Sequence, residues 1–225
     1  MRRGGAAAWF LELRAVGAQD AVICGRDRVN KLKGLCRIIS HPRELRLTLS
    51  GLAVRLGGDD AFGGLSDEEL GALVAWVERT SPSCVVEVGT LFGFTASALA
   101  RRTRAHVVAV DNFCWNPFGL TPDQHEAFAR RVLADSGVEL VRGDAADYLA
   151  NRIEAPQSTL VFLDGDHSYE GVLGELRILK DRGVAVVAGH DFGNPLFGVT
   201  RAVREELGEP DEVVGMCWMK RLAGR

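Results

Sequence analysis

The stretch Cys84-Val-Val-Glu-Val-Gly-Thr-Leu-Phe-Gly93 joins a short apolar run to a turn that contains two glycines. Its β-branched residues lack a helical period, which predicts a buried strand over residues 84–88. Gly89 and Gly93 allow the backbone to turn tightly and to approach a ligand near the start of the next helix. The same turn also fits an ordinary strand-to-helix connection, so it does not identify a ligand by itself.

Four more apolar runs follow this stretch and alternate with segments of helical period. We expect buried strands at residues 84–88, 106–110, 138–141, 159–163 and 184–188, and helices at residues 95–104, 122–135, 145–152, 169–179 and 198–207. This alternation predicts an α/β fold, a doubly wound and mostly parallel sheet of the Rossmann-like kind. Residues 212–221 predict a final strand at the edge of the sheet.

The residues before this region divide less clearly into elements. Ser66 and Glu69 have the spacing of a capping box, and the apolar stripe after them predicts a helix at residues 67–79. Residues 6–22 predict another helix, whereas residues 44–56 fit either a strand or a helix. We therefore expect an N-terminal helical cap or dimerisation segment at residues 1–65 and an α/β domain at residues 66–225.

The composition limits the classes of partner. With 27 basic and 30 acidic side chains the net charge is -3, which gives no electrostatic reason to expect nucleic acid or a membrane surface. The apolar run near the N-terminus is interrupted by Glu12 and Arg14 before it reaches the length of a signal-peptide core or a membrane span. Five cysteines without a CxxC pair favour reduced thiols. We expect a cytoplasmic protein with a small-molecule partner.

Ligands of an open α/β sheet bind beyond the carboxyl ends of the strands, so acids at these positions are candidate site residues. Glu87 would repel a phosphate, and it favours a cationic or amino-bearing ligand. Asp111 is placed to accept hydrogen bonds from both hydroxyls of a ribose. Asp144 can meet an adenine amino group or cap the helix that begins at Ala145, and the two roles are compatible.

Together these segments resemble the class I S-adenosylmethionine-dependent methyltransferases over residues 83–221. The resemblance implies that residues 66–225 form the domain that binds S-adenosylmethionine. The cofactor-binding residues that it implies are Glu87, Gly89, Thr90, Gly93, Asp111, Asn112, Asp144, Ala145 and Asp164.

Later motifs resemble a small bacterial branch of that class, which includes macrolide-sugar O-methyltransferases and cephalosporin-hydroxylase-like proteins. These motifs are Phe162-Leu-Asp164-Gly-Asp166-His167-Ser-Tyr169-Glu170-Gly171, Gly189-His190-Asp191-Phe192, Gly198-Val-Thr-Arg201-Ala-Val and Val213-Val-Gly-Met-Cys-Trp218.

A divalent metal is one reading of the acids after the fourth and fifth strands. In related catechol and macrolide-sugar methyltransferases, an acid after the fourth strand and an adjacent pair after the fifth bind magnesium, which implies metal ligands at Asp164, His190 and Asp191. His190 stands where an acid is usual, so magnesium, manganese, iron and no metal all stay open.

For catalysis, His167 is the candidate base together with Asp164. The alternative for His167 is a residue at a helix start whose ring is bonded to Asp166 or to backbone. The loop at residues 112–121 is long enough to fold over the ligands, and an ordinary surface loop is the alternative.

These observations predict an enzyme that methylates a hydroxyl of a small-molecule acceptor, an activity suited to secondary metabolism. The alternatives are an N-methyltransferase or a metal-dependent hydroxylase-like enzyme on the same scaffold, and a non-catalytic cofactor-binding domain. A nicotinamide-dependent oxidoreductase is disfavoured by Glu87 and by the glycine spacing. Residues 1–65 are expected to cap the acceptor pocket or to form a homodimer contact.

Overall fold

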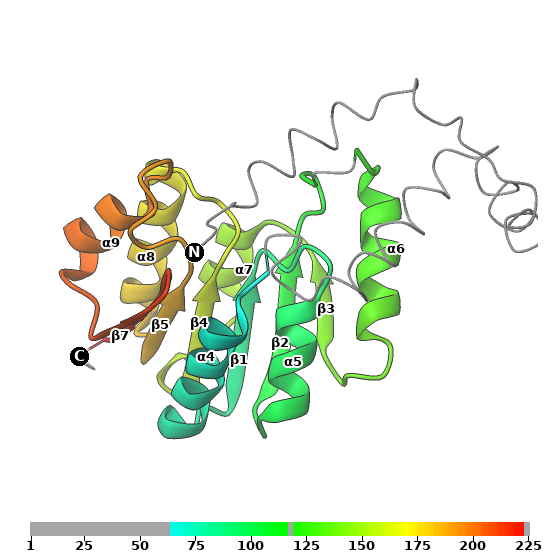
Figure 1. Ribbon diagram of the computed structural model, residues 1–225, viewed down its shortest axis with the longest axis horizontal. Coiled ribbons are helices and arrows are strands. Elements are labelled where there is room, and N and C mark those ends of the chain that lie inside the picture. Colours follow the sequence, from blue (N-terminus) through cyan, green and yellow to red (C-terminus); the bar gives the residue numbers. More distant parts are fainter. Residues whose placement is uncertain (1–63, 117–118, 223–225) are drawn as a thin grey trace, which may run out of the picture. The chain divides into compact units, whose positions relative to one another are not determined.

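The computed structural model describes residues 64–116 and 119–222 (Figure 1). Its helices are α4 (Asp67–Thr80), α5 (Phe94–Arg102), α6 (Pro122–Leu133), α7 (Ala145–Asn151), α8 (Tyr169–Arg182) and α9 (Val199–Leu207), with the 3-10 helix η3 (Pro156–Ser158). Its strands are β1 (Cys84–Val88), β2 (His106–Asp111), β3 (Glu139–Arg142), β4 (Thr159–Leu163), β5 (Val186–Gly189), β6 (Glu212–Val214) and β7 (Cys217–Arg221). The predicted helix at residues 6–22 and the ambiguous segment at residues 44–56 lie outside the described residues, as does nearly all of the expected cap segment.

The described strands form one seven-stranded sheet in the order β3-β2-β1-β4-β5-β7-β6. The strands from β1 to β5 pair in parallel, whereas β7 runs antiparallel to both of its neighbours. This arrangement confirms the predicted doubly wound, mostly parallel sheet. The strand order reverses between β1 and β4, where Val88 pairs with Leu163, so the switch point at which such sheets bind ligands lies there.

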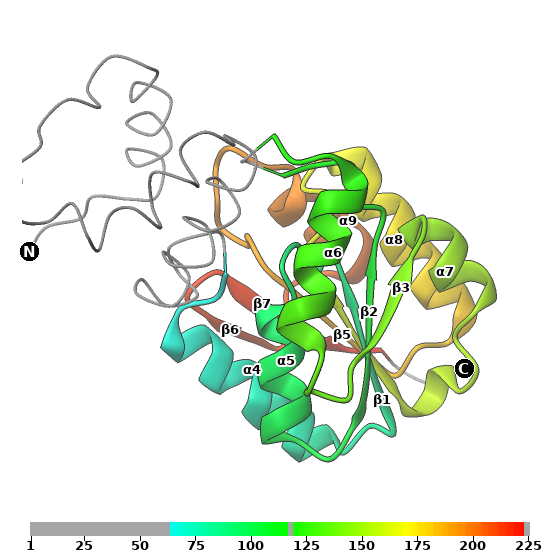
Figure 2. The same cartoon turned by 90° about the vertical axis from the view of Figure 1, so that its right-hand side faces the viewer.

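Helices cover both faces of the sheet, with α4, α5 and α6 on one face and α7, α8 and α9 on the other (Figure 2). Because successive residues of a strand point to opposite faces, Val85 packs in the first layer and Val86 in the second. Both side chains are at most 1% exposed. The two-sided burial explains why these strands are continuous apolar runs without polar alternation.

Helix α4 begins at the predicted capping box. The backbone N–H of Glu69 donates to the Ser66 hydroxyl, and the Glu69 carboxylate accepts from the Ser66 N–H at 2.9 Å. The helix ends at Thr80 because Ser81 adopts a left-handed conformation. Across residues 64–116 and 119–222, no helix combines the length and the hydropathy of a membrane span.

The prediction of one edge strand over residues 212–221 was wrong. The segment forms two strands, β6 and β7, which are joined by a turn where Gly215 has a φ of +60°. Strand β7 lies inside the sheet between β5 and β6, and its Trp218 is fully buried. Strand β6 is an edge strand and carries Glu212, whereas the other polar residues that indicated an edge, Lys220 and Arg221, lie at the end of β7.

The ends of β1 and β4 approach each other closely at Gly89. This residue has a φ of +83°, and a Cβ atom added there would lie 2.4 Å from the carbonyl oxygen of Asp164. Glycine is therefore required both by the left-handed backbone and by the backbone of the neighbouring strand end.

Gly89→Ala should lower the free energy of unfolding by about 3 kcal/mol or more, because it adds a backbone clash to the left-handed penalty. Gly137→Ala is the matched control, since Gly137 has a φ of +77° but a Cβ atom there meets nothing within 4 Å. This control should lose about 1 kcal/mol. Urea denaturation measures both variants, and equal losses would show that the close approach of β1 and β4 contributes nothing.

Candidate functional site

The acids predicted from the sequence lie at one edge of the sheet. Glu87 stands near the end of β1, Asp111 ends β2, Asp144 follows β3, Asp164 follows β4, and Asp191 follows β5. Since these five strands are parallel, their carboxyl ends form the same rim (Figure 1). The rim contains the switch point between β1 and β4, so the structure brings the candidate residues to the place where a ligand is expected.

Glu87 is a buried carboxyl group at the centre of this rim. Its side chain is 2% exposed and accepts hydrogen bonds from the Thr90 hydroxyl and the Ala96 backbone N–H. Burial raises the pKa of Glu87 to about 8, and the nearby carboxylates of Asp164 and Asp111 raise it further than burial alone would. The group therefore holds a proton at neutral pH, and it would ionise beside a cationic ligand.

Asp111 joins the first loop of the rim, which follows β1, to the second loop, which follows β2. Its Oδ2 accepts the Leu91 N–H at 2.9 Å and its Oδ1 accepts the Phe113 N–H at 2.6 Å. Both donors are non-glycine residues in left-handed conformations, with φ values of +47° and +58°. Each carboxylate oxygen still has a lone pair, so the group keeps the capacity to accept ribose hydroxyls. The tethering role was not predicted.

His125 on α6 supports the first loop and was missed by the sequence analysis. The ring is fully buried, and its Nε2 lies 2.7 Å from the carbonyl oxygen of Leu91. A carbonyl can only accept, so Nε2 carries the proton. Burial lowers the pKa of His125, which keeps the ring neutral, and its edges contact Phe92 and Phe113. The available signal was its place on the apolar stripe of α6 with Phe128.

The loops after β2 and β3 have local roles in the structure. Asp144 caps α7, because its Oδ1 accepts the Asp147 N–H at 2.9 Å, which confirms the capping alternative. The adenine contact of Asp144 and Ala145 stays a prediction. Asn112 accepts the Cys114 N–H through its side chain and so shapes the loop after β2. In that loop Trp115 is 69% exposed, whereas residues 117–118 lie outside the described residues.

The three predicted metal ligands converge at the ends of β4 and β5. The Nδ1 atom of His190 lies 3.6 Å from Asp164 Oδ1 and 3.7 Å from Asp191 Oδ2. The three ligand atoms lie within 4.8 Å of one another. Burial alone would lower the pKa of His190, but the two carboxylates raise it to about 10. A positive charge between the two carboxylates, from a proton or from a metal ion, therefore stabilises the cluster.

His167 extends this cluster towards solvent. Its Nδ1 lies 3.2 Å from Asp191 Oδ2, its side chain is 33% exposed, and its ring stacks on Phe197 with centroids 4.7 Å apart. Within the described residues no hydrogen bond or ion pair joins the His167 ring to Asp166, whose Oδ1 accepts the Ser168 N–H at 2.7 Å. An imidazole held at Nδ1 by a carboxylate has its Nε2 available to accept a proton.

The strand order, the antiparallel β7 and the acids at the rim together define the class I methyltransferase fold. In agreement, residues 86–192 match the family model of a methyltransferase domain. The protein is thus an enzyme of the methyltransferase class, built on this domain.

Several solved structures share the fold. Cofactor-bound Rv0187 from MTB is 24% identical with a TM-score of 0.52, covering 76% of this chain and 79% of that one. The O-methyltransferase TomG from Streptomyces achromogenes is 20% identical with a TM-score of 0.52, covering 79% and 90%. The methyltransferase PaMTH1 from Podospora anserina is 14% identical with a TM-score of 0.56, covering 91% and 100%. A comparison with curated proteins found no match.

Glu87→Gln should change how stability depends on pH in the ligand-free protein. The folded state holds the Glu87 proton up to about pH 8, whereas the unfolded chain releases it near the ordinary value of 4.5. Between these values the wild type should lose up to about 1.4 kcal/mol of stability per pH unit relative to the variant. Urea denaturation from about pH 5 to about pH 8 measures this difference. Parallel profiles would mean that Glu87 ionises normally in the fold.

Proposed function

We propose that the protein transfers the methyl group of S-adenosylmethionine to an oxygen atom of a small-molecule acceptor. The observation that carries the proposal is a pair of acids, Glu87 and Asp111, which lie at the ends of β1 and of its neighbour β2, beside the switch point. Glu87 is buried and would ionise beside a cation. Each carboxylate oxygen of Asp111 accepts one backbone N–H and can still accept a hydroxyl. TomG is an O-methyltransferase solved with S-adenosylmethionine, which supports this reading of the shared fold.

Different residues of the rim would bind different parts of this cofactor. Glu87 receives the cationic α-amino group of the methionine end, since a nearby cation favours the ionised form of Glu87. Asp111 accepts the two ribose hydroxyls, and the start of α7 at Asp144 lies on the side of the rim where adenine would extend. S-adenosylmethionine, when bound, supplies an activated methyl group, so the protein mainly has to align the acceptor.

His167 is the proposed base in this reaction. Asp191 Oδ2 lies beside its Nδ1, which leaves Nε2 to accept the proton that the acceptor hydroxyl would lose when its oxygen takes the methyl group and S-adenosylhomocysteine leaves. Phe197 stacks against the ring and limits its rotation. Asp164 lies beside both His190 and the Gly89 turn, so it is placed between the proposed metal and cofactor positions.

We also propose that Asp164, His190 and Asp191 hold a divalent cation, with Mn²⁺ fitting the mixed nitrogen and oxygen donors better than Mg²⁺. The separations of 3.6 and 3.7 Å are too long for hydrogen bonds. Two donors that share an ion at about 2.1 Å are about 3.0–3.7 Å apart, which these separations match. A cation there would orient the acceptor hydroxyl and lower its pKa.

Asp111→Ala should weaken the binding of S-adenosylmethionine at least about tenfold, because it removes the ribose acceptors and the tether of the first loop. Asp135→Ala is the control, since Asp135 is an exposed acid beyond the end of α6, away from the rim. Calorimetry on cofactor-stripped protein measures both, with S-adenosylhomocysteine as competitor. Wild-type protein that binds neither compound would overturn the proposed function, and binding would justify a screen of hydroxylated acceptors by product mass.

Asp191→Ala should weaken the binding of Mn²⁺ by about 100-fold or more, because it removes a ligand from the proposed site. Asp166→Ala should bind Mn²⁺ like the wild type, since Asp166 lies in the same loop as His167 but holds only local backbone. Electron paramagnetic resonance of free Mn²⁺ measures both. Equal affinities in the two variants would place any bound Mn²⁺ elsewhere.

A further inference from the structure

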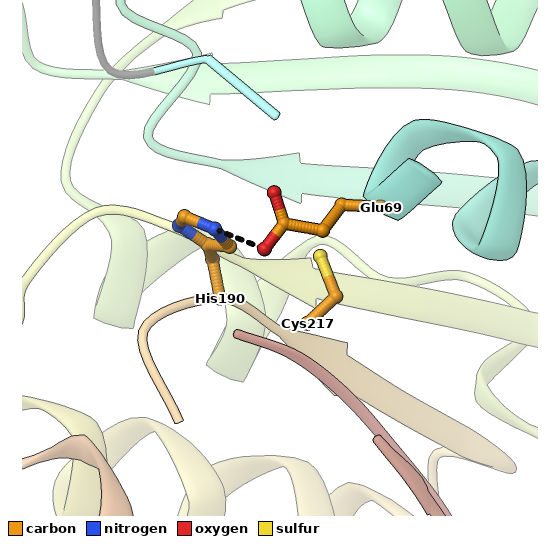
Figure 3. Close-up of side chains that lie close together, drawn as sticks. All are labelled: Glu69, His190 and Cys217. Atoms are coloured by element: carbon orange, nitrogen blue, oxygen red, sulfur yellow. Dashed lines mark hydrogen bonds and ion pairs between the residues drawn. The ribbon is translucent and has the colours of Figure 1, made fainter. Parts of the chain in front are cut away.

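Glu69 on α4 contacts the proposed cation site of Asp164, His190 and Asp191, although it lies outside β4 and β5, whose ends form that site. Its side chain is 8% exposed. Oxygen Oε2 accepts the N–H and the hydroxyl of Ser66 at 2.9 and 2.8 Å, which completes the capping box. Oxygen Oε1 accepts the Met216 N–H at 2.7 Å and lies 3.3 Å from His190 Nε2 (Figure 3). The cap uses one oxygen, and the other faces the β6–β7 turn and His190.

The protonation of the Glu69–His190 pair follows from its hydrogen bonds. Oxygen Oε1 of Glu69 accepts the Met216 N–H and Oε2 accepts the N–H and the hydroxyl of Ser66, so both oxygens act as acceptors. His190 must then carry a proton on Nε2 to face this oxygen. The other ring nitrogen, Nδ1, is left facing Asp164 and Asp191. A carboxylate on the far nitrogen of a metal-binding histidine fixes its tautomer and its orientation.

Cys217 is the third side chain of this group (Figure 3). It is fully buried, and burial together with the carboxylates of Glu69, Asp164 and Asp191 raises the pKa of its thiol. Within the described residues no hydrogen bond joins this thiol to Glu69 or His190, whereas Glu69 Oε1 lies 3.3 Å from His190 Nε2. Cys217 therefore packs beside the pair, and the polar contact of His190 Nε2 in this group is with Glu69.

The turn between β6 and β7 is shaped around the same carboxylate. A Cβ atom at Gly215 would lie 2.5 Å from Glu69 Oε1, so only glycine leaves room for the oxygen. The carbonyl of Met216 in turn accepts the N–H of Phe192, directly after Asp191. Glu69 thus fixes His190 and also connects to the backbone that follows Asp191.

We propose that Glu69 is the positioning residue of the cation site, holding the Nε2–H of His190 so that Nδ1 faces Asp164 and Asp191. This inference rests on the proposed function, because it assigns a role at the cation site proposed above. It places α4 and the β6–β7 turn in the functional unit alongside the ends of β4 and β5.

The test compares three variants with Mn²⁺ as the probe. Glu69→Met removes the acceptor, Glu69→Gln keeps an acceptor oxygen and a capping-box side chain, and Ser66→Ala disturbs the cap alone. Glu69→Met should weaken Mn²⁺ binding about 10–100-fold, Glu69→Gln should restore most of it, and Ser66→Ala should bind like the wild type. Thermal denaturation establishes that each variant is folded. In ¹⁵N-histidine spectra without metal, the Nε2 proton of His190 should be protected from exchange and should lose that protection in Glu69→Met.

The outcomes separate this role from a structural one and from the proposed function. Equal Mn²⁺ losses in Ser66→Ala and Glu69→Met would overturn the positioning role and leave Glu69 as a helix cap. A folded Glu69→Met that binds Mn²⁺ normally, or a wild type that binds none, would overturn it as well. Failure of the wild type to bind S-adenosylmethionine, with the Mn²⁺ pattern intact, would overturn the methyl-transfer proposal and leave the role of Glu69 standing.

Discussion

The parallel pairing of β1 with β4 is the constraint on which the site depends. Val88 pairs with Leu163, so the segments that follow them leave the sheet side by side where the strand order reverses. Gly89 then packs against the backbone of Asp164, which leaves no room for a side chain. Because β2, β3 and β5 are added in parallel, their loops leave the same edge. The positions of the candidate acids are consequences of this pairing.

Several carboxyl groups lie close together at that edge, and their mutual repulsion changes which of the groups there carry a proton. Burial and neighbouring acids keep Glu87 protonated at neutral pH, so a cationic ligand would find a group that gains by ionising. The ring of His190 lies between Asp164 and Asp191 and supplies a positive charge when it is protonated, a charge that the proposed cation would otherwise supply. A cation that binds only the folded state would stabilise this edge, which would link folding to ligand binding.

Most of the sheet could be predicted because strands buried on both faces are continuous apolar runs, and the bounds of β1 and β4 agree with the prediction. The β6–β7 pair could not be predicted in the same way. The mixed polarity of residues 212–221 fits one edge strand, and the turn at Gly215 that divides the segment depends on a single glycine. The acids of the rim followed from strand ends alone. His125 and Glu69 were missed as site residues because an apolar stripe and a capping box explain them locally. Their contacts with Leu91 and His190 join residues 34 and 121 positions apart.

Glu69 shows how a local signal can hide a distant role. A capping box needs a carboxylate that reaches back to the start of its helix, and one oxygen is enough for this. The second oxygen of Glu69 is free to meet Met216 and His190, so the start of α4 and the orientation of a site histidine depend on one side chain. Since Glu69 and Met216 lie outside the matched residues 86–192, the unit that orients His190 is larger than the methyltransferase domain match.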